Sequence, residues 1–195
     1  MSRFVKIVHT IVLILIPGGG KAIANYIRRF KIFGCIGENV SIQSRRLPVY
    51  PKLVYIHNNV LIATDVRFTV HDGIHNMLNN IYGRGTIAEK MGCIEIGNNV
   101  FVGAGCRILY NTRIGNNVIV GAGSLVNKDI PDNSVYAGVP AKKICSFDEY
   151  VKKTVEWSNS FKALYGEMIN GNVNDKFADL LYSEFVKEKE KAGNL

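Results

Sequence analysis

A six-residue spacing of aliphatic side chains is the feature that most constrains how this chain can fold. It runs without a miss through Ile96, Val102, Ile108, Ile114, Val120 and Val126. The residue two positions before each of the later five is small or β-branched: Val100, Cys106, Thr112, Val118 and Ser124. Residues two apart on a strand point to the same face. Each unit therefore predicts a very short strand with two inward side chains, followed by a corner.

The corners are marked by glycine and asparagine. In four units the residue after the aliphatic one is a glycine: Gly97, Gly103, Gly115 and Gly121. Asn98-Asn99 and Asn116-Asn117 follow two of these glycines, as tight turns with left-handed residues require. The chain has 19 glycines but only 5 prolines, which favours turns or close packing over a flexible linker.

A strand and a corner repeated at constant phase turn the chain through a fixed angle, which predicts stacked parallel coils, a β-solenoid. The same phase occurs earlier in the sequence, at Ile36, Ile42, Ile56, Ile62 and Phe68. Two segments break it. The stretch from Ile42 to Ile56 predicts a distorted coil with Pro48 and Pro51, and residues 73–92 form an excursion. A long loop that leaves a regular scaffold is a usual place for function.

The sequence predicts three regions. Residues 1–33 form an N-terminal helical segment, and residues 34–145 form the solenoid with its excursion. Residues 146–195 form a C-terminal tail, where apolar residues recur every three to four positions in two amphipathic helices separated by Gly166 to Asn174. Solenoid ends need covering, so the tail is expected to cap the coils and make subunit contacts, or else to shape the acceptor site.

Composition excludes several classes of protein. With 47% hydrophobic and 21% charged residues, the chain is globular and is neither disordered nor a coiled coil as a whole. It has no Walker loop or dinucleotide fingerprint, and no nucleic-acid partner is expected. The spacing of its four cysteines matches no metal or redox motif, which favours reduced thiols in a cytoplasmic protein.

The N-terminal end is basic. The net charge is +8, and residues 1–37 contain Lys and Arg but no acid. The apolar run Phe4 to Ile16 is too short to span a bilayer, and Gly18 to Gly20 do not resemble a signal-peptide cleavage site. Two interpretations stay open: a solvated basic helix, or peripheral contact with an anionic surface at the inner face of the membrane.

These repeats resemble those of the hexapeptide-repeat acyltransferases over residues 34–145. The resemblance implies a mostly β fold, a left-handed parallel β-helix in which three units close one triangular turn, and a homotrimer. The sugar, polysaccharide and xenobiotic O-acetyltransferases are most similar: residues 68–72 match their histidine-bearing loop start, and residues 126–131 and 137–142 match the end of their last coil. Residues 26–39 are similar to capsule and lipopolysaccharide O-acetyltransferases.

The resemblance implies an acetyl-CoA-dependent O-acetyltransferase that acts on a hydroxyl of a sugar or surface-polysaccharide precursor. Such transfer needs a base for the hydroxyl proton and a donor to the oxyanion. Neutral histidine suits the role of base near pH 7, and His71 is the candidate. His75 could orient His71, contact the acceptor or be an ordinary loop residue. Asp72, Asp65 and any backbone carbonyl are candidates for orienting His71.

The resemblance also places the co-substrate and the acceptor. The pantetheine arm is expected along Phe101, Gly103, Ala104, Gly121 and Ala122, and the adenine and phosphates near Asn127, Lys128, Lys142 and Lys143. The glycines are also expected from the geometry of the corners, and Lys142 and Lys143 could be solvated charges. Gln43, Arg45 and Asp72 are candidate acceptor contacts. Simple-sugar acetyltransferases carry asparagine where this chain has Gln43-Ser44-Arg45-Arg46, and two arginines suit an acidic or phosphorylated acceptor.

Three alternatives stay open. A xenobiotic acetyltransferase of the chloramphenicol or streptogramin type is the first of them. A zinc enzyme of the γ-carbonic-anhydrase type would need a third histidine in a coil near His71 and His75, so no metal is expected. A non-enzymatic solenoid scaffold is the third. His57 replaces a corner glycine and His9 lies in the N-terminal apolar run, so both are expected to be structural.

Overall fold

Three short β-sheets form the body of the computed structural model, which describes residues 3–165 and 173–191. The first sheet contains β1 (Cys35–Ile36), β3 (Val54–Ile56), β6 (Ile94–Ile96) and β9 (Thr112–Ile114). The second contains β2 (Val40–Ile42), β4 (Val60–Ile62), β7 (Val100–Val102), β10 (Val118–Val120), β12 (Ser134–Ala137) and β13 (Lys142–Ser146). The third contains β5 (Arg67–Thr69), β8 (Arg107–Leu109) and β11 (Leu125–Val126).

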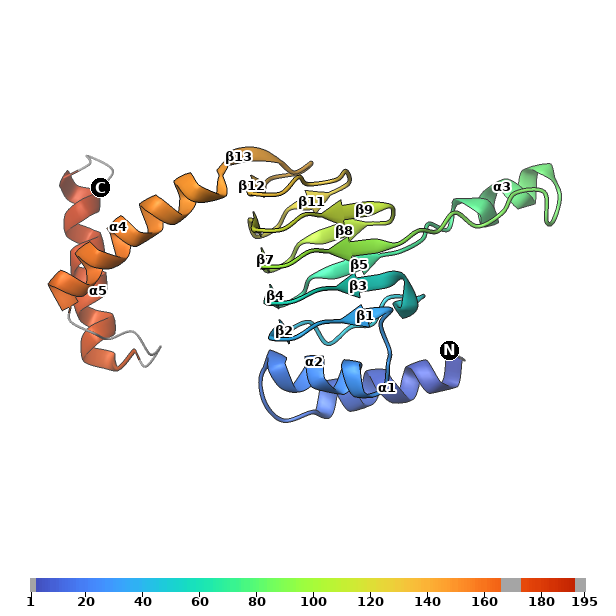
Figure 1. Cartoon of the computed structure of the whole chain (residues 1–195), viewed down its shortest axis with the longest axis horizontal. Helices are drawn as coiled ribbons and strands as arrows, with labels where there is room; N and C mark the ends of the chain where they lie inside the picture. The colour runs from blue at the N-terminus through green and yellow to red at the C-terminus, as the bar shows by residue number, and fades with distance from the viewer. Residues whose placement is uncertain (1–2, 166–172, 192–195) are drawn as a thin grey trace. The chain divides into compact units, whose positions relative to one another are not determined.

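The chain visits the three sheets in turn and then starts again one level higher (Figure 1). Pairing is parallel throughout the coils, and Ile94 lies beside Thr112 just as Val100 lies beside Val118. Three six-residue units therefore complete one circuit. The last coil ends differently, because β13 turns back antiparallel to β12.

The core is the column of side chains that the six-residue phase predicts to be inward. The aliphatic residues of the uninterrupted repeat are all buried, with exposed fractions of 0–1%: Ile96, Val102, Ile108, Ile114, Val120 and Val126. The five small or β-branched residues two positions earlier are also buried. The predicted inward positions are thus confirmed.

Asparagine ladders form the corners between the first and second sheets. Five asparagines there have φ of 52–57°: Asn39, Asn59, Asn99, Asn117 and Asn133. The side-chain amides of the first four each donate to the next asparagine, with N–O distances of 2.7–2.9 Å. Asparagine suits this corner because it tolerates the left-handed conformation and its amide bonds to the same residue one coil along.

The glycines that open the corners serve close packing and not left-handed geometry. A Cβ on Gly103 would lie 2.5 Å from the backbone nitrogen of Ala122, so no other residue fits without a shift. The left-handed residue at this corner comes two positions later, at Gly105 and Gly123. The expectation of left-handed residues at corners therefore holds for the asparagines and for these later glycines.

Two helices cover the first end of the coils: α1 (Arg3–Leu15) and α2 (Gly20–Arg29). Their buried side chains Leu13, Ile23 and Ile27 join the solenoid core. These helices and the coils form one compact unit, Met1–Val151. No helix within the described residues is long and apolar enough to cross a membrane.

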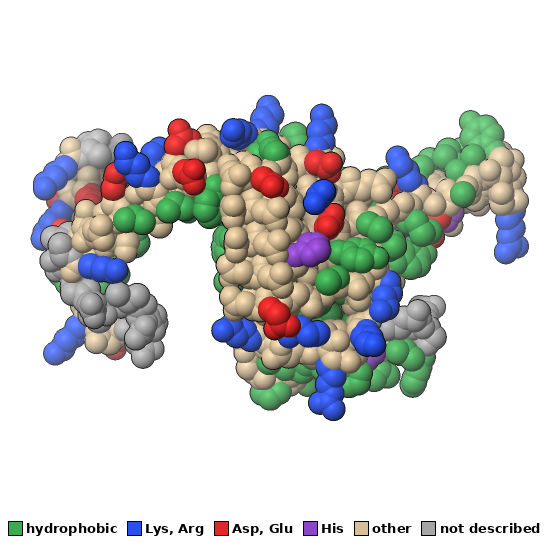
Figure 2. Space-filling view, viewed as in Figure 1, with side chains coloured by type: hydrophobic (Ala, Val, Ile, Leu, Met, Phe, Trp, Pro, Cys, Tyr) green, Lys and Arg blue, Asp and Glu red, His purple; other side chains and the backbone are tan. Residues whose placement is uncertain are grey.

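The remaining elements lie outside the regular coils. The distorted coil between Ile42 and Ile56 contains a single 3-10 turn, η1 (Pro51–Leu53). The excursion contains a helix that its sequence pattern does not predict, α3 (Ile74–Tyr82), and hydrophobic side chains gather on the surface of that arm (Figure 2). Two helices, α4 (Phe147–Tyr165) and α5 (Asp175–Lys191), occupy the predicted tail, and residues 152–195 form the second compact unit.

Candidate active site

The base of the excursion holds the candidate catalytic histidine. The outgoing and returning arms pair antiparallel at His71 and Met91. The Asp72 backbone N–H donates to the Lys90 carbonyl at 3.0 Å on one side of this bridge. This pairing therefore fixes His71 at the corner where the chain passes from the third sheet back to the first sheet.

Coil stacking brings two tyrosines to this corner. Tyr50 comes from the coil before, and its ring lies edge-on to the His71 ring with 5.4 Å between centroids. Tyr110 comes from the coil after, because β8 pairs with β5 and Tyr110 follows Leu109 as Val70 follows Thr69. The His71 side chain is 26% exposed, so it lies at the surface of the coil and not in the core, as predicted.

Glu89 is the carboxylate that faces His71. Its Oε1 lies 3.8 Å from His71 Nε2, and its other oxygen accepts a hydrogen bond of 2.7 Å from the Tyr50 hydroxyl. That hydrogen bond raises the pKa of Tyr50, with burial and the negative charge of Glu89 acting in the same direction. Tyr50 thereby holds the carboxylate next to the imidazole.

Asp72 has partners other than His71. Its Oδ2 accepts a hydrogen bond of 2.7 Å from the Tyr110 hydroxyl, and its Oδ1 accepts one of 3.2 Å from the Ile74 N–H. The Tyr110 hydrogen bond holds the pKa of Asp72 below its usual value, with further help from Ile74 and from Lys90. Asp72 therefore fixes the start of α3. Asp65, the other candidate partner, lies on the corner between the second and third sheets.

Both predicted histidines have a buried ring nitrogen without a hydrogen-bond partner. These are Nδ1 of His71 and Nδ1 of His75, and among the residues that the structure describes no other buried side-chain nitrogen or oxygen shares this property. Buried polar atoms are nearly always paired, so such an atom asks for an explanation. Within the described residues of a single chain, these two nitrogens therefore remain unpaired.

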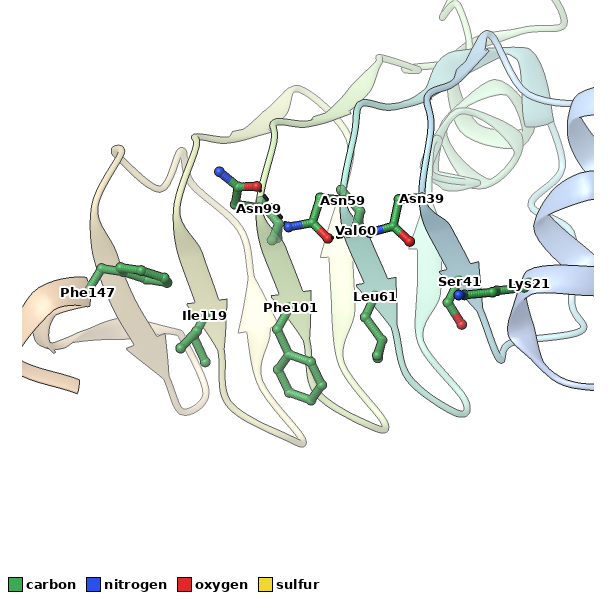
Figure 3. A pocket seen from close by; sticks show the side chains of 11 residues that line it. Lys21, Asn39, Ser41, Asn59, Val60, Leu61, Asn99, Phe101, Ile119 and Phe147 are labelled. Atoms are coloured by element: carbon green, nitrogen blue, oxygen red, sulfur yellow. Dashed lines mark hydrogen bonds between the residues drawn. The ribbon is translucent and has the colours of Figure 1, made fainter. Parts of the chain in front are cut away.

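The expected pantetheine residue Phe101 lies on the outer face of the second sheet. Leu61, Phe101 and Ile119 extend from successive strands into one groove of about 390 Å³ (Figure 3). The asparagine ladder forms one wall, and Lys21 and Phe147 lie at its margins. The groove is an extended surface of the kind that a long, thin ligand requires.

The other expected pantetheine residues line the adjoining corner. Gly103 and Ala104 lie one coil before Gly121 and Ala122, in contact through their backbones. Lys142 and Lys143, expected near the phosphates, lie exposed on β13 of the same second sheet. Seven of the nine expected CoA residues thus share this sheet and its corner.

Asn127 and Lys128 lie elsewhere. They follow β11 at the corner between the third and first sheets, two coils beyond His71 on the same corner. Within one chain, the third sheet separates this corner from Gly103 and Ala104. The structure therefore divides the expected co-substrate residues into two groups.

The expected acceptor residues are also divided. Gln43 is exposed on the corner that carries Gly103, where its side-chain oxygen accepts a hydrogen bond of 3.1 Å from Thr64. The Arg45 guanidinium donates to the carbonyls of Leu13, Ile14 and Ile16 at 2.6–3.1 Å. Arg45 thereby caps α1, so the acceptor contact expected of it has no support in the structure.

Sequence reasoning missed three residues of the site, Tyr50, Glu89 and Tyr110. Each is far from His71 in the sequence; Tyr50 and Glu89 lie beside His71, whereas Tyr110 contacts its neighbour Asp72. Only the register of β8 against β5 could have indicated Tyr110, because Tyr110 follows β8 at the position where Val70 follows β5. Within residues 3–165 and 173–191, no group of three His, Cys, Asp or Glu side chains could hold a metal ion.

Comparison with known proteins gives matches over the same coils. Residues 93–128 match the family described as bacterial transferase hexapeptide (six repeats). Protein CapG of Staphylococcus aureus is 42% identical over 131 residues, which cover 67% of this chain and 70% of CapG. Galactoside O-acetyltransferase of Lactococcus lactis is 40% identical over 87 residues, covering 45% of this chain and 40% of that protein. A solved galactoside acetyltransferase in complex with coenzyme A has 27% identity and a TM-score of 0.56, covering 75% of this chain and 83% of that one.

Proposed function

Because the chain belongs to the bacterial hexapeptide-repeat transferases and is an acetyltransferase that uses acetyl-CoA, we propose that it acetylates a hydroxyl of a sugar or surface-polysaccharide precursor. The acceptor class is supported by the name of one relative, galactoside O-acetyltransferase. A capsule or lipopolysaccharide precursor carries sugar hydroxyls of this kind. A xenobiotic acceptor, the alternative, has no named support among these relatives.

The observation that carries the proposal is the position of His71 at the base of the excursion, where its Nε2 faces the Glu89 carboxylate and its Nδ1 has no hydrogen-bond partner. The His71 ring lies edge-on to Tyr50, and its Nε2 lies 3.8 Å from the carboxylate of Glu89. A histidine in this setting can accept a proton because the carboxylate at 3.8 Å stabilises the imidazolium that forms.

The reaction needs one proton acceptor and one electrophile. His71 takes the proton of the acceptor hydroxyl as the oxygen attacks the thioester carbonyl carbon of acetyl-CoA. The resulting tetrahedral oxyanion collapses with cleavage of the carbon–sulfur bond. The imidazolium then returns the proton to the CoA thiolate, so the products are the O-acetyl ester and free CoA thiol.

The division of the candidate residues supports an assembly in which a neighbouring copy completes the site, and the family resemblance favours a homotrimer with left-handed coils. In one chain the base lies on one corner, whereas Gly103, Ala104 and the groove of Phe101 lie beyond the third sheet. A neighbouring copy that sets its second-sheet corner against the excursion would bring a donor groove to His71. Light scattering should give a mass of about three times the 21.6 kDa of one chain, and a uniform monomer would contradict this assembly.

One experiment tests the activity directly. Purified protein is mixed with acetyl-CoA and a panel of nucleotide sugars, free sugars, capsule oligosaccharides and chloramphenicol, and release of free thiol is followed. We expect acceptor-dependent thiol release with a carbohydrate, and acetyl-CoA alone should raise the melting temperature because it binds only the folded state. Thiol release only with chloramphenicol would favour the xenobiotic alternative. No melting shift at millimolar acetyl-CoA would contradict the acetyltransferase assignment.

A further inference from the structure

Helix α1 turns an apolar face toward solvent. Six of its apolar side chains have exposed fractions of 42–74%: Phe4, Ile7, Val8, Ile11, Ile14 and Leu15. Their spacing of three and four residues places them in one continuous stripe along the helix. A soluble helix normally carries its polar face outward, so this arrangement is the reverse of the usual one.

The opposite side of α1 is attached to the body of the protein. Leu13 is fully buried. The Nδ1 atom of His9 lies within hydrogen-bond distance, 2.8 Å, of the Tyr26 hydroxyl on α2. Arg45 binds three carbonyls at the end of the helix. The helix is therefore fixed in an orientation that keeps the apolar stripe outward.

The surroundings of this stripe are positively charged. No acidic residue occurs before Glu38, whereas Lys21, Arg29 and Lys31 are exposed on or just after α2. Hydrophobic and basic side chains gather along the end of the molecule that α1 and α2 form (Figure 2). An apolar stripe flanked by cations is the pattern of helices that lie in the interface of an anionic membrane.

We propose that α1 binds the surface of a membrane containing anionic lipid, with its apolar stripe among the upper acyl chains. Its 13 residues span about 20 Å, less than the roughly 30 Å of a bilayer core, so the helix lies in the plane of the surface. If a second copy of the chain packed against this stripe, the basic side chains of the two copies would face and repel each other. An anionic lipid surface neutralises them, and it is therefore the occupant that the charge favours.

Vesicle sedimentation tests the proposal with the full-length protein. The probes are vesicles of pure phosphatidylcholine and vesicles with about a third phosphatidylglycerol. We expect the protein to sediment with the anionic vesicles and to be released by salt, because screening weakens attraction between exposed charges. Failure of the unmodified protein to bind anionic vesicles at low salt would overturn the proposal.

Matched substitutions identify the surface that binds. Ile7→Asp with Ile11→Asp should lower partitioning onto anionic vesicles at least tenfold, because it puts two charges into the stripe. Val155→Asp on α4 is the control, since Val155 and Ile11 are both 51% exposed, and it should bind like the unmodified protein. Equal loss in the control would overturn the proposal.

A third variant separates charge from apolar contact. Arg29→Glu with Lys31→Glu should reduce binding to anionic vesicles severalfold and leave the mass in light scattering unchanged. If the Ile7→Asp, Ile11→Asp protein instead falls to a lower oligomeric mass, α1 contacts another copy and the membrane proposal is wrong.

Discussion

The Tyr50 hydroxyl donates a hydrogen bond of 2.7 Å to Glu89, a residue 39 positions later in the chain. Tyr50 precedes η1 in the first coil, whereas Glu89 lies on the returning arm of the excursion from the second. Stacking of one coil on the next brings them together. The second oxygen of Glu89 is left facing His71, so this hydrogen bond sets the environment of the candidate base.

Glu89→Gln should lower kcat about tenfold. The amide can still accept the Tyr50 hydrogen bond, but it removes the negative charge that stabilises the imidazolium formed when His71 takes a proton. Glu89 acts through His71 and touches no reacting atom in this scheme, so it is a positioning residue. Steady-state kinetics should show the loss in kcat with the KM for acetyl-CoA unchanged.

Tyr50→Phe is the companion variant. It keeps the carboxylate but releases it from its hydrogen bond, so a smaller loss of kcat is expected. A fall in melting temperature that paralleled kcat in both variants would mean that the pair is only structural.

Tyr110→Phe should raise the pKa of Asp72. The Tyr110 hydrogen bond is the largest cause of the lowered pKa of this carboxylate, and the variant removes it while keeping the ring under Lys90. Because the folded-state pKa lies below the unfolded value of about 3.9, the stabilisation from the Asp72 charge is complete above that pH. It is lost as the pH falls through the folded-state pKa. Carboxyl-carbon NMR titration measures the change.

The control for Tyr110 is Tyr55→Phe, which alters an exposed tyrosine on the first sheet. It should leave the Asp72 titration where it is in the unmodified protein. An Asp72 titration that is the same with and without the Tyr110 hydroxyl would contradict the assigned cause.

The coils could be predicted because their pattern is local. Each inward position, such as Ile108 or Val120, repeats after six residues, and burial follows directly from that phase. The helix α3 could not be predicted, since the excursion has no repeat to align it. The capping role of Arg45 was missed for another reason: the helix end that it binds lies about 30 residues earlier in the chain.

The candidate site could be predicted only in part. The break in phase after Phe68 located His71, and the structure places it at the coil surface where the excursion begins. Its neighbours Tyr50 and Glu89 come from other levels of the stack, and no local pattern marks them. Their position next to His71 depends on how many residues each coil contains. That number departs from the regular repeat in the distorted first coil and in the excursion.

Arg45→Ala should destabilise α1 selectively. Hydrogen bonds from a charged donor are worth about 1.5–3 kcal/mol each at most, and solvent screening at this half-buried site reduces the total to about 1–3 kcal/mol. Amide hydrogen exchange in residues 3–16 should speed up more than in the coils. The neighbouring Arg46→Ala is the control, because Arg46 is exposed, and it should leave exchange in α1 unchanged. Uniform acceleration along the whole chain would show that Arg45 stabilises more than this helix end.

His71→Ala should lower acceptor-dependent turnover by about 10² to 10⁴, the usual worth of one positioned base. The side chain lies at the coil surface, so its removal should leave the oligomeric mass and the melting shift with acetyl-CoA unchanged. His75→Ala should cost less unless His75 binds the acceptor through its unpaired Nδ1, in which case the KM for acceptor rises and kcat is retained. Thiol release at saturating substrates measures both. If His75→Ala abolishes turnover while His71→Ala retains it, the base is His75; if both retain it, transfer does not use a histidine base.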